Sequence, residues 1–339
     1  MMQPAITAVI LAAGKGTRMK SARAKVLHEV FFQPMLNHVL RAVKEAGLDR
    51  CAVVIGHQRE AVMRVLTGRD LVPVIQEEQN GTGHAVLCTE SACATSDLVM
   101  ILCGDTPLIR PETLRAMIEA HHNNQASLTL MTTLLDQPFG YGRILKNAQG
   151  EITGIVEEKD ADDEQRRIQE VNAGIYLVER RFLFEALRKV GTANSQGEVY
   201  LTDIVAIANR EGLVVRPFVH PQAMDVLGVN SRIELAQAQA ALQQRHNREL
   251  MLSGITLLSP ETTLIEPGCT IGRDCLIEPG VQIVAGSRLG EGCRVASGAV
   301  LVNCIVGDGA SVGANSVLSN CTIPADAVIA PLTLRGPES

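Results

Sequence analysis

The hydrophobic positions follow two different periods along the chain. From Ile6 to about Val219, short apolar runs rich in β-branched residues alternate with amphipathic segments of helical length. The runs predict strands over 6–11, 51–55, 71–75, 98–102 and 127–132, and the amphipathic segments predict helices over 35–46, 60–66, 84–94 and 111–121. Strongly apolar strands separated by helices indicate a mainly parallel sheet covered on both faces. The N-terminal part is therefore predicted to be a Rossmann-like α/β domain with a parallel-dominated mixed sheet.

A different pattern begins near Ser231. Ser231 and Glu234 have the spacing of a capping box, and an alanine- and glutamine-rich segment follows as far as Leu252. This segment predicts one long helix, roughly 30 Å at about 1.5 Å per residue. We therefore expect an α/β domain over 1–228, a connecting helix over 229–252 and a further domain over 253–339.

That further domain repeats with a period of six. An aliphatic residue stands at 265, 271, 277, 283, 289, 295 and 301, and after shorter steps at 306, 312, 318, 323 and 329. The fifth residue of each hexad is small, and glycine is common in the fourth place, at Gly268, Gly280, Gly286, Gly292 and Gly298. This period predicts a parallel β-helix with three flat faces and about four coils, one hexad to a face. A meander of ordinary strands would show period two and no fixed corner glycines.

Charge and composition narrow the class of partner. The net charge of -6 and the pI near 5.8 leave no basic field for a nucleic acid, so we expect small-molecule partners. The chain has no apolar run of about 18 residues and no signal-peptide pattern, which predicts a cytoplasmic protein without a membrane partner. The nine cysteines include no pair with zinc or redox spacing and are expected to be reduced. Cys269, Cys275 and Cys293 fall on small inward positions of the repeat and are expected to pack there.

The turn after the first strand carries the first chemical signal. Ala12, Ala13 and Gly14 would let backbone N–H groups approach a polyphosphate, with the N-terminus of a helix expected behind them. The cations that we expect at the same turn are those of Lys15, Arg18 and Lys25. This combination suits a triphosphate, although the turn matches neither a Walker loop nor a complete dinucleotide fingerprint.

Two further strand ends should meet that turn. Asp105 follows an apolar strand, and ligands of open α/β sheets bind at the carboxyl ends of strands, where a carboxylate can hold Mg²⁺ against phosphate. Taken alone, Asp105 could equally be a turn or cap aspartate before the helix at 111. Gln76 ends another strand and could pair with a base, while Gly81 permits close approach. His84 stands near a helix start and is interpreted as a cap or packing group.

Together these motifs resemble the sugar nucleotidyltransferases. The matching positions are Leu11-Ala-Ala-Gly-x-Gly-Thr-x-Met19, Lys25, Gln76, 81–85 and Gly104-Asp105. The segments 140–144, 154–157, 169–172, 197–203 and 228–230 are similar to the bacterial N-acetylglucosamine-1-phosphate uridylyltransferases. The resemblance extends from residue 6 to about 320, and it implies a role in the biosynthesis of UDP-N-acetylglucosamine for peptidoglycan and lipopolysaccharide.

The resemblance also implies residue roles. Asp105 and Asn230 would coordinate Mg²⁺, Arg18 and Lys25 would neutralise phosphate charge, and Lys25, Arg18 and Asp105 would be catalytic. The nucleotide would be held by Leu11, Ala12, Ala13, Gly14, Gln76, Gly81 and Thr82. The acetamido-sugar pocket would be formed by Gly142, Glu157, Asn172, Tyr200 and Thr202.

Three departures from the family pattern stand out. Cys103 replaces a tyrosine common beside the sugar, and Ala24 replaces the proline before the lysine. Family members normally carry a longer left-handed β-helix with a second activity, acetyl transfer from acetyl-CoA. This chain ends at Ser339, before the region that would supply those residues. We therefore expect a truncated left-handed β-helix, no acetyltransferase activity and, as the resemblance suggests, a homotrimer formed through the β-helix.

The expected reaction is in-line attack of N-acetylglucosamine 1-phosphate on the α-phosphorus of UTP, with release of pyrophosphate. The nucleophile is already an anion, so charge neutralisation and positioning suffice without a general base. The alternatives are another sugar 1-phosphate or dTTP, and a non-catalytic regulatory or assembly subunit. An acyltransferase, suggested by the hexad repeat alone, is disfavoured because no histidine follows His246.

Overall fold

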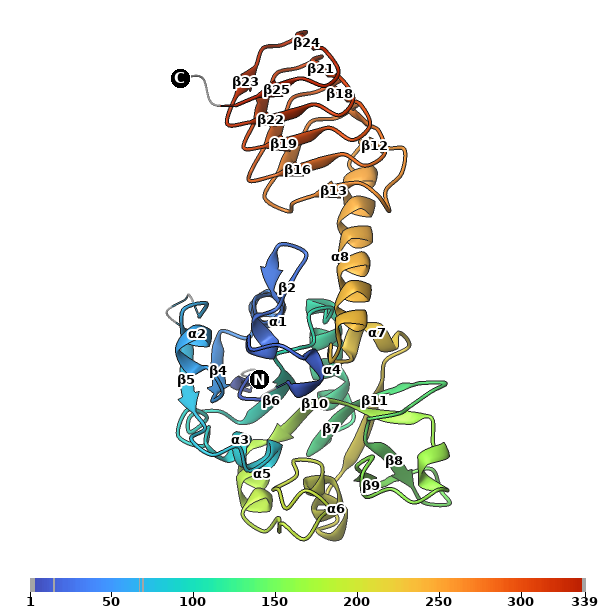
Figure 1. Ribbon diagram of the computed structural model, residues 1–339. Coiled ribbons are helices and arrows are strands. Elements are labelled where there is room, and N and C mark those ends of the chain that lie inside the picture. The colour runs from blue at the N-terminus through green and yellow to red at the C-terminus, as the bar shows by residue number, and fades with distance from the viewer. Residues whose placement is uncertain (1–3, 15, 67, 69, 337–339) are drawn as a thin grey trace. The chain divides into compact units, whose positions relative to one another are not determined.

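The computed structural model describes residues 4–14, 16–66, 68 and 70–336. Contacts divide the chain into two compact units, one up to Leu235 and one from Ala236 onwards. Helix α8 (Arg232–Leu252) begins in the first unit and ends in the second (Figure 1). A long helix is thus confirmed, while the finer boundaries expected at 228 and 252 stay predictions.

The first unit is built on a nine-stranded mixed sheet. Its main strands are β1 (Ile6–Leu11), β4 (Arg50–Ile55), β5 (Leu71–Ile75), β6 (Leu98–Cys103), β7 (Leu128–Leu134), β10 (Glu170–Glu179) and β11 (Val215–Val219). They lie in the order β11-β7-β10-β6-β1-β4-β5, and β8 (Arg143–Lys146) and β9 (Ile152–Val156) extend the sheet beside β10. Strand β10 runs antiparallel to β6 and β7, whereas the pairs β1–β4, β1–β6, β4–β5 and β7–β11 are parallel.

Helices cover both faces of this sheet. They are α1 (Met35–Glu45), α2 (Arg59–Met63), α3 (Thr82–Leu87), α4 (Pro111–Asn123), α5 (Arg180–Leu187), α6 (Asp203–Arg210) and α7 (Ala223–Val226). Alternate residues of β1 belong to two separate hydrophobic clusters: Ala8 and Ile10 pack with α1 and α4, and Val9 packs with α3, α5 and α6. Every one of these three side chains is fully buried. The expected two-sided parallel-dominated sheet is confirmed.

The predicted elements agree closely with the structure, with three corrections. Helix α2 ends at Met63 and α3 at Leu87, both shorter than predicted, and the chain continues from α3 in turns. In the described residues after the glycine turn, a single 3₁₀ turn, η1 (Thr17–Met19), takes the place of an α-helix. It is followed by η2 (Lys25–Leu27) and a hairpin of β2 (Glu29–Val30) and β3 (Gln33–Pro34). The expectation of a helix N-terminus at this place was wrong.

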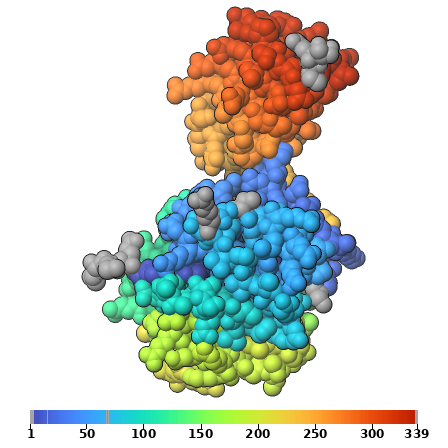
Figure 2. Space-filling view, turned by 90° about the vertical axis from the view of Figure 1, so that its left-hand side faces the viewer, coloured from blue at the N-terminus to red at the C-terminus, as the bar shows by residue number. Residues whose placement is uncertain are grey.

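The second unit contains three parallel sheets wound from successive short strands. In chain order β12 is Thr256–Leu257, β13 Leu264–Ile265, β14 Thr270–Ile271, β15 Leu276–Ile277, β16 Gln282–Val284, β17 Arg288–Leu289, β18 Arg294–Val295, β19 Val300–Val302, β20 Ile305–Val306, β21 Ser311–Val312, β22 Val317–Ser319, β23 Thr322–Ile323, β24 Val328–Ile329 and β25 Leu334–Arg335. Every third strand pairs, as in β13-β16-β19-β22-β25. Figure 2 shows one face of this β-helix, coloured orange to red.

The repeat explains the packing of the coils. Thr270 pairs with Arg288, eighteen residues on, so three hexads make one coil. The short steps before Val306 and Ile323 reduce the offset to seventeen without breaking the ladder, since Arg288 pairs with Ile305. The predicted small inward residues are all buried: Cys269, Cys275, Val281, Ser287, Cys293, Ala299, Ala310 and Ser316.

Corner geometry follows the prediction at four of the five glycines. Gly280, Gly286, Gly292 and Gly298 have φ between 65° and 73°, a region that residues with a Cβ rarely adopt. Gly268 also lies in the turn between β13 and β14, but it is not among the positive-φ residues, so this corner does not require glycine for its backbone conformation. The nine cysteines are free thiols. No helix within the described residues combines the length and apolar character that crossing a membrane needs.

Candidate active site

A cavity of about 520 Å³ opens at the carboxyl ends of β1 and β6. Strand β1 pairs in parallel with β6, placing Leu11 opposite Cys103, so the turn after β1 and the loop after β6 lie side by side. The lining includes every residue predicted for the nucleotide, catalysis and metal: Leu11, Ala12, Ala13, Gly14, Gln76, Gly81, Thr82, Arg18, Lys25, Asp105 and Asn230. Lys15 was also expected there but lies outside the described residues.

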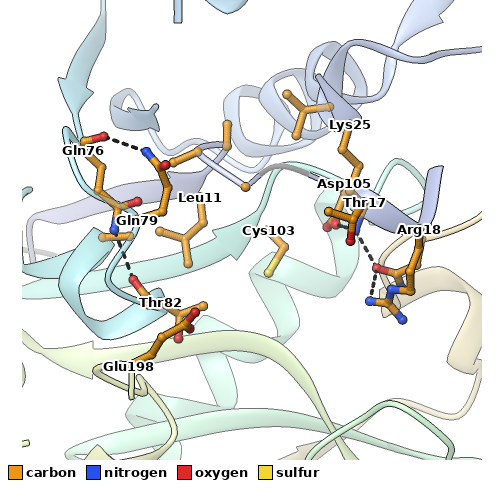
Figure 3. A pocket seen from close by; sticks show the side chains of 18 residues that line it. Leu11, Thr17, Arg18, Lys25, Gln76, Gln79, Thr82, Cys103, Asp105 and Glu198 are labelled. Atoms are coloured by element: carbon orange, nitrogen blue, oxygen red, sulfur yellow. Dashed lines mark hydrogen bonds and ion pairs between the residues drawn. The ribbon is translucent and has the colours of Figure 1, made fainter. Parts of the chain in front are cut away.

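The positive side chains gather at one end of the cavity around an acidic group. Lys25 forms an ion pair with the carboxylate of Asp105, and the Nζ of Lys25 donates to Oδ1 of Asn230 at 2.6 Å. Arg18 donates from Nη2 to the same amide oxygen at 2.8 Å. Figure 3 shows Lys25, Asp105, Thr17 and Arg18 close together, away from Gln76 and Thr82.

Local backbone structure fixes this cluster. Gly16 has φ +60°, and a Cβ there would lie 2.5 Å from Cβ of Lys25, so only glycine lets the lysine stem pack against the turn. Gly228 leaves room for Asp105, since a Cβ at 228 would lie 2.8 Å from Oδ1 of that carboxylate. The N–H of Val229 also donates to the backbone oxygen of Asp105 at 2.8 Å.

The start of α8 orients Asn230. The backbone N–H of Asn230 donates to Oε2 of Glu234 at 2.5 Å, and the N–H of Glu234 donates to Oγ of Ser231 at 3.2 Å. The predicted capping box is thus present, with its carboxylate bound to residue 230 rather than 231. In addition, Nδ2 of Asn230 donates to the carbonyl of Gly228 at 2.8 Å, which turns its amide oxygen toward the cations.

The other end of the cavity presents an amide. Gln76 is 3% exposed, and its Nε2 lies 3.2 Å from the carbonyl of Gly81 and 3.1 Å from Nδ1 of His84. His84 therefore contacts Gln76, in agreement with its interpretation as a packing group. The N–H of Gln76 donates to the carbonyl of Ile55 at 2.8 Å, which extends the β4–β5 ladder to the cavity. A fixed amide at a strand end can recognise the edge of a base.

A distant segment closes this end. Gly81 has φ +103°, and a Cβ there would lie 2.5 Å from the carbonyl of Val199. The N–H of Gly83 donates to that carbonyl at 2.8 Å, and the N–H of Leu201 donates to Oγ1 of Thr82 at 3.1 Å. The pairing brings Glu198 into the cavity wall.

Four of the five predicted sugar residues are joined by direct contacts. The hydroxyl of Thr202 donates to Oε1 of Glu157 at 3.1 Å, and a Cβ at Gly142 would lie 3.4 Å from Oε2 of Glu157. The N–H of Asn172 donates to the carbonyl of Gly142 at 2.9 Å. Burial raises the pKa of Glu157 against the opposing hydrogen bond from Thr202.

Tyr200, the fifth, is 7% exposed. Burial raises the pKa of its hydroxyl, and the carboxylates of Asp160 and Glu157 raise it further. The five sugar residues are not among those that line the 520 Å³ cavity.

Cys103 lies between the two ends of the cavity (Figure 3). Burial raises the pKa of its thiol to about 12, the carboxylate of Asp105 raises it further, and Lys25 lowers it. The thiol is therefore neutral near pH 7. The Sγ of Cys103 would lie 3.2 Å from a Cβ placed on Gly174 of β10, so the side chain of Cys103 packs closely against the backbone of β10 at this glycine.

Some lining residues were not predicted. Thr17, Gln79 and Glu198 belong to the cavity wall. Thr17 and Gln79 stand inside the motifs used for prediction, so proximity in sequence could have indicated them. Glu198 also stands inside a matching segment, 197–203, but its place in this cavity depends on the pairing of 80–83 with 199–201.

Known proteins agree with this architecture. The model of the MobA-like NTP transferase domain matches residues 8–197, and that of the bacterial transferase hexapeptide matches 268–303, which supports a left-handed β-helix. The chain is 50% identical over 297 residues to the bifunctional protein GlmU of Desulfotalea psychrophila, covering 87% of this chain and 88% of that protein. It is 49% identical to the bifunctional protein GlmU of Geobacter metallireducens, of which it spans 63%.

A solved structure resembles the fold alone. It is a putative glucose-1-phosphate thymidylyltransferase from Bacillus anthracis in complex with a sucrose, with a TM-score of 0.57 and 20% identity. The similarity covers 70% of this chain and 95% of that one.

Proposed function

We infer the reaction from the premise that this chain belongs to the GlmU family and carries a MobA-like NTP transferase domain. The chain is a nucleotidyltransferase that forms UDP-N-acetylglucosamine. We propose that it uses UTP and N-acetylglucosamine 1-phosphate and releases pyrophosphate. The observation that carries the proposal is the convergence of Lys25, Arg18, Asp105 and Asn230 at one end of a cavity whose other end offers Gln76.

The divalent metal of this family would be Mg²⁺ held by Asp105 and Asn230. Among the described residues no group of three or more His, Cys, Asp or Glu side chains is placed to hold a metal. One carboxylate and one amide oxygen nevertheless suit Mg²⁺, which takes few protein ligands and completes its shell with water and substrate phosphates. The ammonium of Lys25 already lies against both oxygens, which marks a cation-binding position. When bound, the ion would polarise phosphate oxygens and neutralise their charge.

The side chains of the protein would bind the nucleotide and neutralise the charge of its phosphates. The uracil ring would lie at Gln76, Gly81 and Thr82, and the triphosphate would extend along the turn of Ala12, Ala13 and Gly14 toward Lys25. The ammonium of Lys25 and the guanidinium of Arg18 would lower the repulsion between two anionic substrates. Holding the sugar phosphate in line with the leaving pyrophosphate removes much of the translational and rotational entropy cost of a bimolecular reaction.

The sugar would be bound by Glu157, Thr202, Asn172, Gly142 and Tyr200. A carboxylate whose hydrogen-bonding partner is a threonine hydroxyl retains free lone pairs for a sugar hydroxyl. Cys103 would lie beside this sugar. We propose a cytoplasmic location and a homotrimer for the protein, on the strength of the hexapeptide repeat and the family.

The absence of acetyl transfer stays a prediction, because the relatives are named bifunctional. Mixing the protein with acetyl-CoA and glucosamine 1-phosphate and measuring free thiol would test it. Release of coenzyme A would show the expectation to be wrong.

The decisive experiment measures pyrophosphate release with UTP and N-acetylglucosamine 1-phosphate, with and without Mg²⁺. We expect turnover only when all three are present. Parallel reactions with dTTP and with glucose 1-phosphate would identify the alternative substrates, and no release from any pair would overturn the proposal.

A further inference from the structure

The ammonium of Lys25 occupies the position where the proposed metal would bind. It pairs with the carboxylate of Asp105 and lies 2.6 Å from Oδ1 of Asn230, so one cation bridges both proposed ligands. The side chains of Lys25 and Asp105 are only 14% and 17% exposed, which shields the pair from water. Arg18 takes the remaining approach to the oxygen of Asn230 at 2.8 Å.

A divalent ion and this ammonium cannot share the two oxygens. The amide oxygen of Asn230 already accepts hydrogen bonds from Lys25 and Arg18, which use both of its lone pairs, and two positive charges within a few ångströms repel strongly in a half-buried setting. Without the ammonium, the carboxylate of Asp105 would be left poorly solvated, which is costly. Lys25 therefore stabilises the metal-free site and competes with the metal.

The geometry of Lys25 allows the ammonium to leave. Its Cβ, Cγ and Cδ lie within 3.2 Å of the position of a Cβ at Gly16, so the stem is held against the turn. The ammonium end lies in the wall of the 520 Å³ cavity beside the turn of Gly14. A phosphate bound along that turn would be within reach of the freed ammonium and would replace its lost partners.

Resting on the proposed function, we propose that Lys25 is an exchangeable cation. It holds Asp105 and Asn230 together before the metal binds, and it transfers to the polyphosphate when the metal takes those oxygens. The metal and the nucleotide then bind with positive cooperativity, because each favours the arrangement that the other needs. The lone metal is expected to bind weakly.

The test measures Mn²⁺ affinity by electron paramagnetic resonance, with the full chain and without nucleotide. We compare the wild type with two neutral variants, Lys25→Met and Lys25→Gln. If one of them does not fold, the other still allows the comparison. We expect either variant to bind Mn²⁺ about tenfold more tightly than the wild type, the size of an ordinary coupling between two sites. Thermal unfolding checks folding, and Mg²⁺ should raise Tm more in the variants than in the wild type.

Matched variants separate competition from general charge. Lys20 is exposed on the same segment, and Lys20→Met removes the same charge away from the oxygens, so its Mn²⁺ affinity should match the wild type. Arg18→Met should give a smaller gain than the Lys25 variants, because Arg18 touches only the amide oxygen.

Equal Mn²⁺ affinity in the wild type and in a folded Lys25 variant overturns the inference, and so does an equal gain in Lys20→Met. The proposed function has its own readout, pyrophosphate release by the wild type. Turnover in the wild type together with unchanged Mn²⁺ affinity in the variants rejects only the exchange. Absence of turnover with tighter Mn²⁺ binding rejects only the substrates.

Discussion

Asp105 follows strand β6 and lies in the wall of the candidate active site. Its backbone oxygen accepts from Val229, and its carboxylate faces Gly228 and Lys25. Asp105→Ala should lower kcat at least about 10²-fold, the scale seen when one preorganised electrostatic group is removed. Steady-state pyrophosphate release measures this, with thermal unfolding to verify the fold. Turnover equal to the wild type would remove Asp105 from the mechanism.

Glu157 carries a cost in stability that should depend on pH. Burial raises its pKa above the ordinary glutamate value of 4.5, so the folded state resists ionisation of this carboxyl. Well below pH 4.5, Glu157 is neutral in both the folded and the unfolded state and has no effect of this kind on the free energy of unfolding. As the pH rises through 4.5 toward the pKa of the folded state, the unfolded state ionises more readily and the destabilising effect grows. Glu157→Gln should therefore raise Tm at pH 7 and change it little at strongly acidic pH.

Differential scanning fluorimetry across that range checks the Glu157 prediction. Glu158→Gln is a neighbouring comparison with the opposite sign. Burial raises the pKa of Glu158, but hydrogen bonds from Gly140 and Arg143 outweigh it and lower the pKa overall. That variant should lose stability at pH 7. A Tm gain in both variants would show that the effect is general loss of negative charge.

At the residue scale, the sequence located the side chains of the nucleotide end because they lie beside strand ends. Lys25 and Asp105 are far apart in the chain, yet parallel pairing of β1 with β6 brings them together. Glu198 lies in a segment that the sequence singled out, but its position in the cavity wall was missed because it depends on Gly81 meeting Val199, a contact between loops with no periodic signal. Loop-to-loop contacts of this kind follow from the completed fold.

At the element scale, apolar runs predicted β1, β4, β5, β6 and β7 closely, but they predicted no strand at β10 or β11. In β10, the residues from Tyr176 to Val178 pair antiparallel with β6 and β7, and the register with β7 shifts between Asn172 and Tyr176. A period of two is the same for either direction. The antiparallel β8–β9 hairpin, which lies between β7 and β10 in the chain, was also not predicted.

The first turn of α8 should act on catalysis through Asn230. The carboxylate of Glu234 accepts from the backbone N–H of Asn230 and so fixes the amide that faces Lys25 and Arg18. Glu234→Ala should lower kcat roughly 10- to 100-fold, because small misplacements of a positioned group are costly. Glu234→Gln keeps an acceptor oxygen and should restore most of the activity.

Two comparisons distinguish positioning from loss of helix stability. Glu249→Ala removes an exposed glutamate near the other end of α8 and should leave kcat unchanged. Mn²⁺ affinity measured with the nucleotide present should fall in Glu234→Ala, whereas KM for the sugar phosphate should change little. Unaltered Mn²⁺ affinity in Glu234→Ala would contradict the positioning role.

At the scale of the whole molecule, the three faces of the β-helix differ in their outward residues. The face of β13, β16, β19, β22 and β25 aligns Leu264, Gln282, Val300, Val317 and Leu334 in direct register. A second outward row on this face contains Val284 and Val302. The face of β14, β17, β20 and β23 aligns Thr270, Arg288, Ile305 and Thr322 instead. The row from Leu264 to Leu334 is aliphatic apart from Gln282, and a largely apolar face suits association with another chain.

We expect the aliphatic face to mediate the proposed trimer. Val317 lies in its register and is 40% exposed, so a charge there would be buried without a partner in an assembled face. Val317→Glu should shift the mass measured by multi-angle light scattering from a trimer toward a monomer at micromolar concentration. Thr322→Glu places the same charge on another face of the β-helix and should leave the trimer intact. A wild-type monomer, or equal dissociation by both variants, would contradict the assignment of this face, because only a face-specific interface predicts that the two substitutions differ.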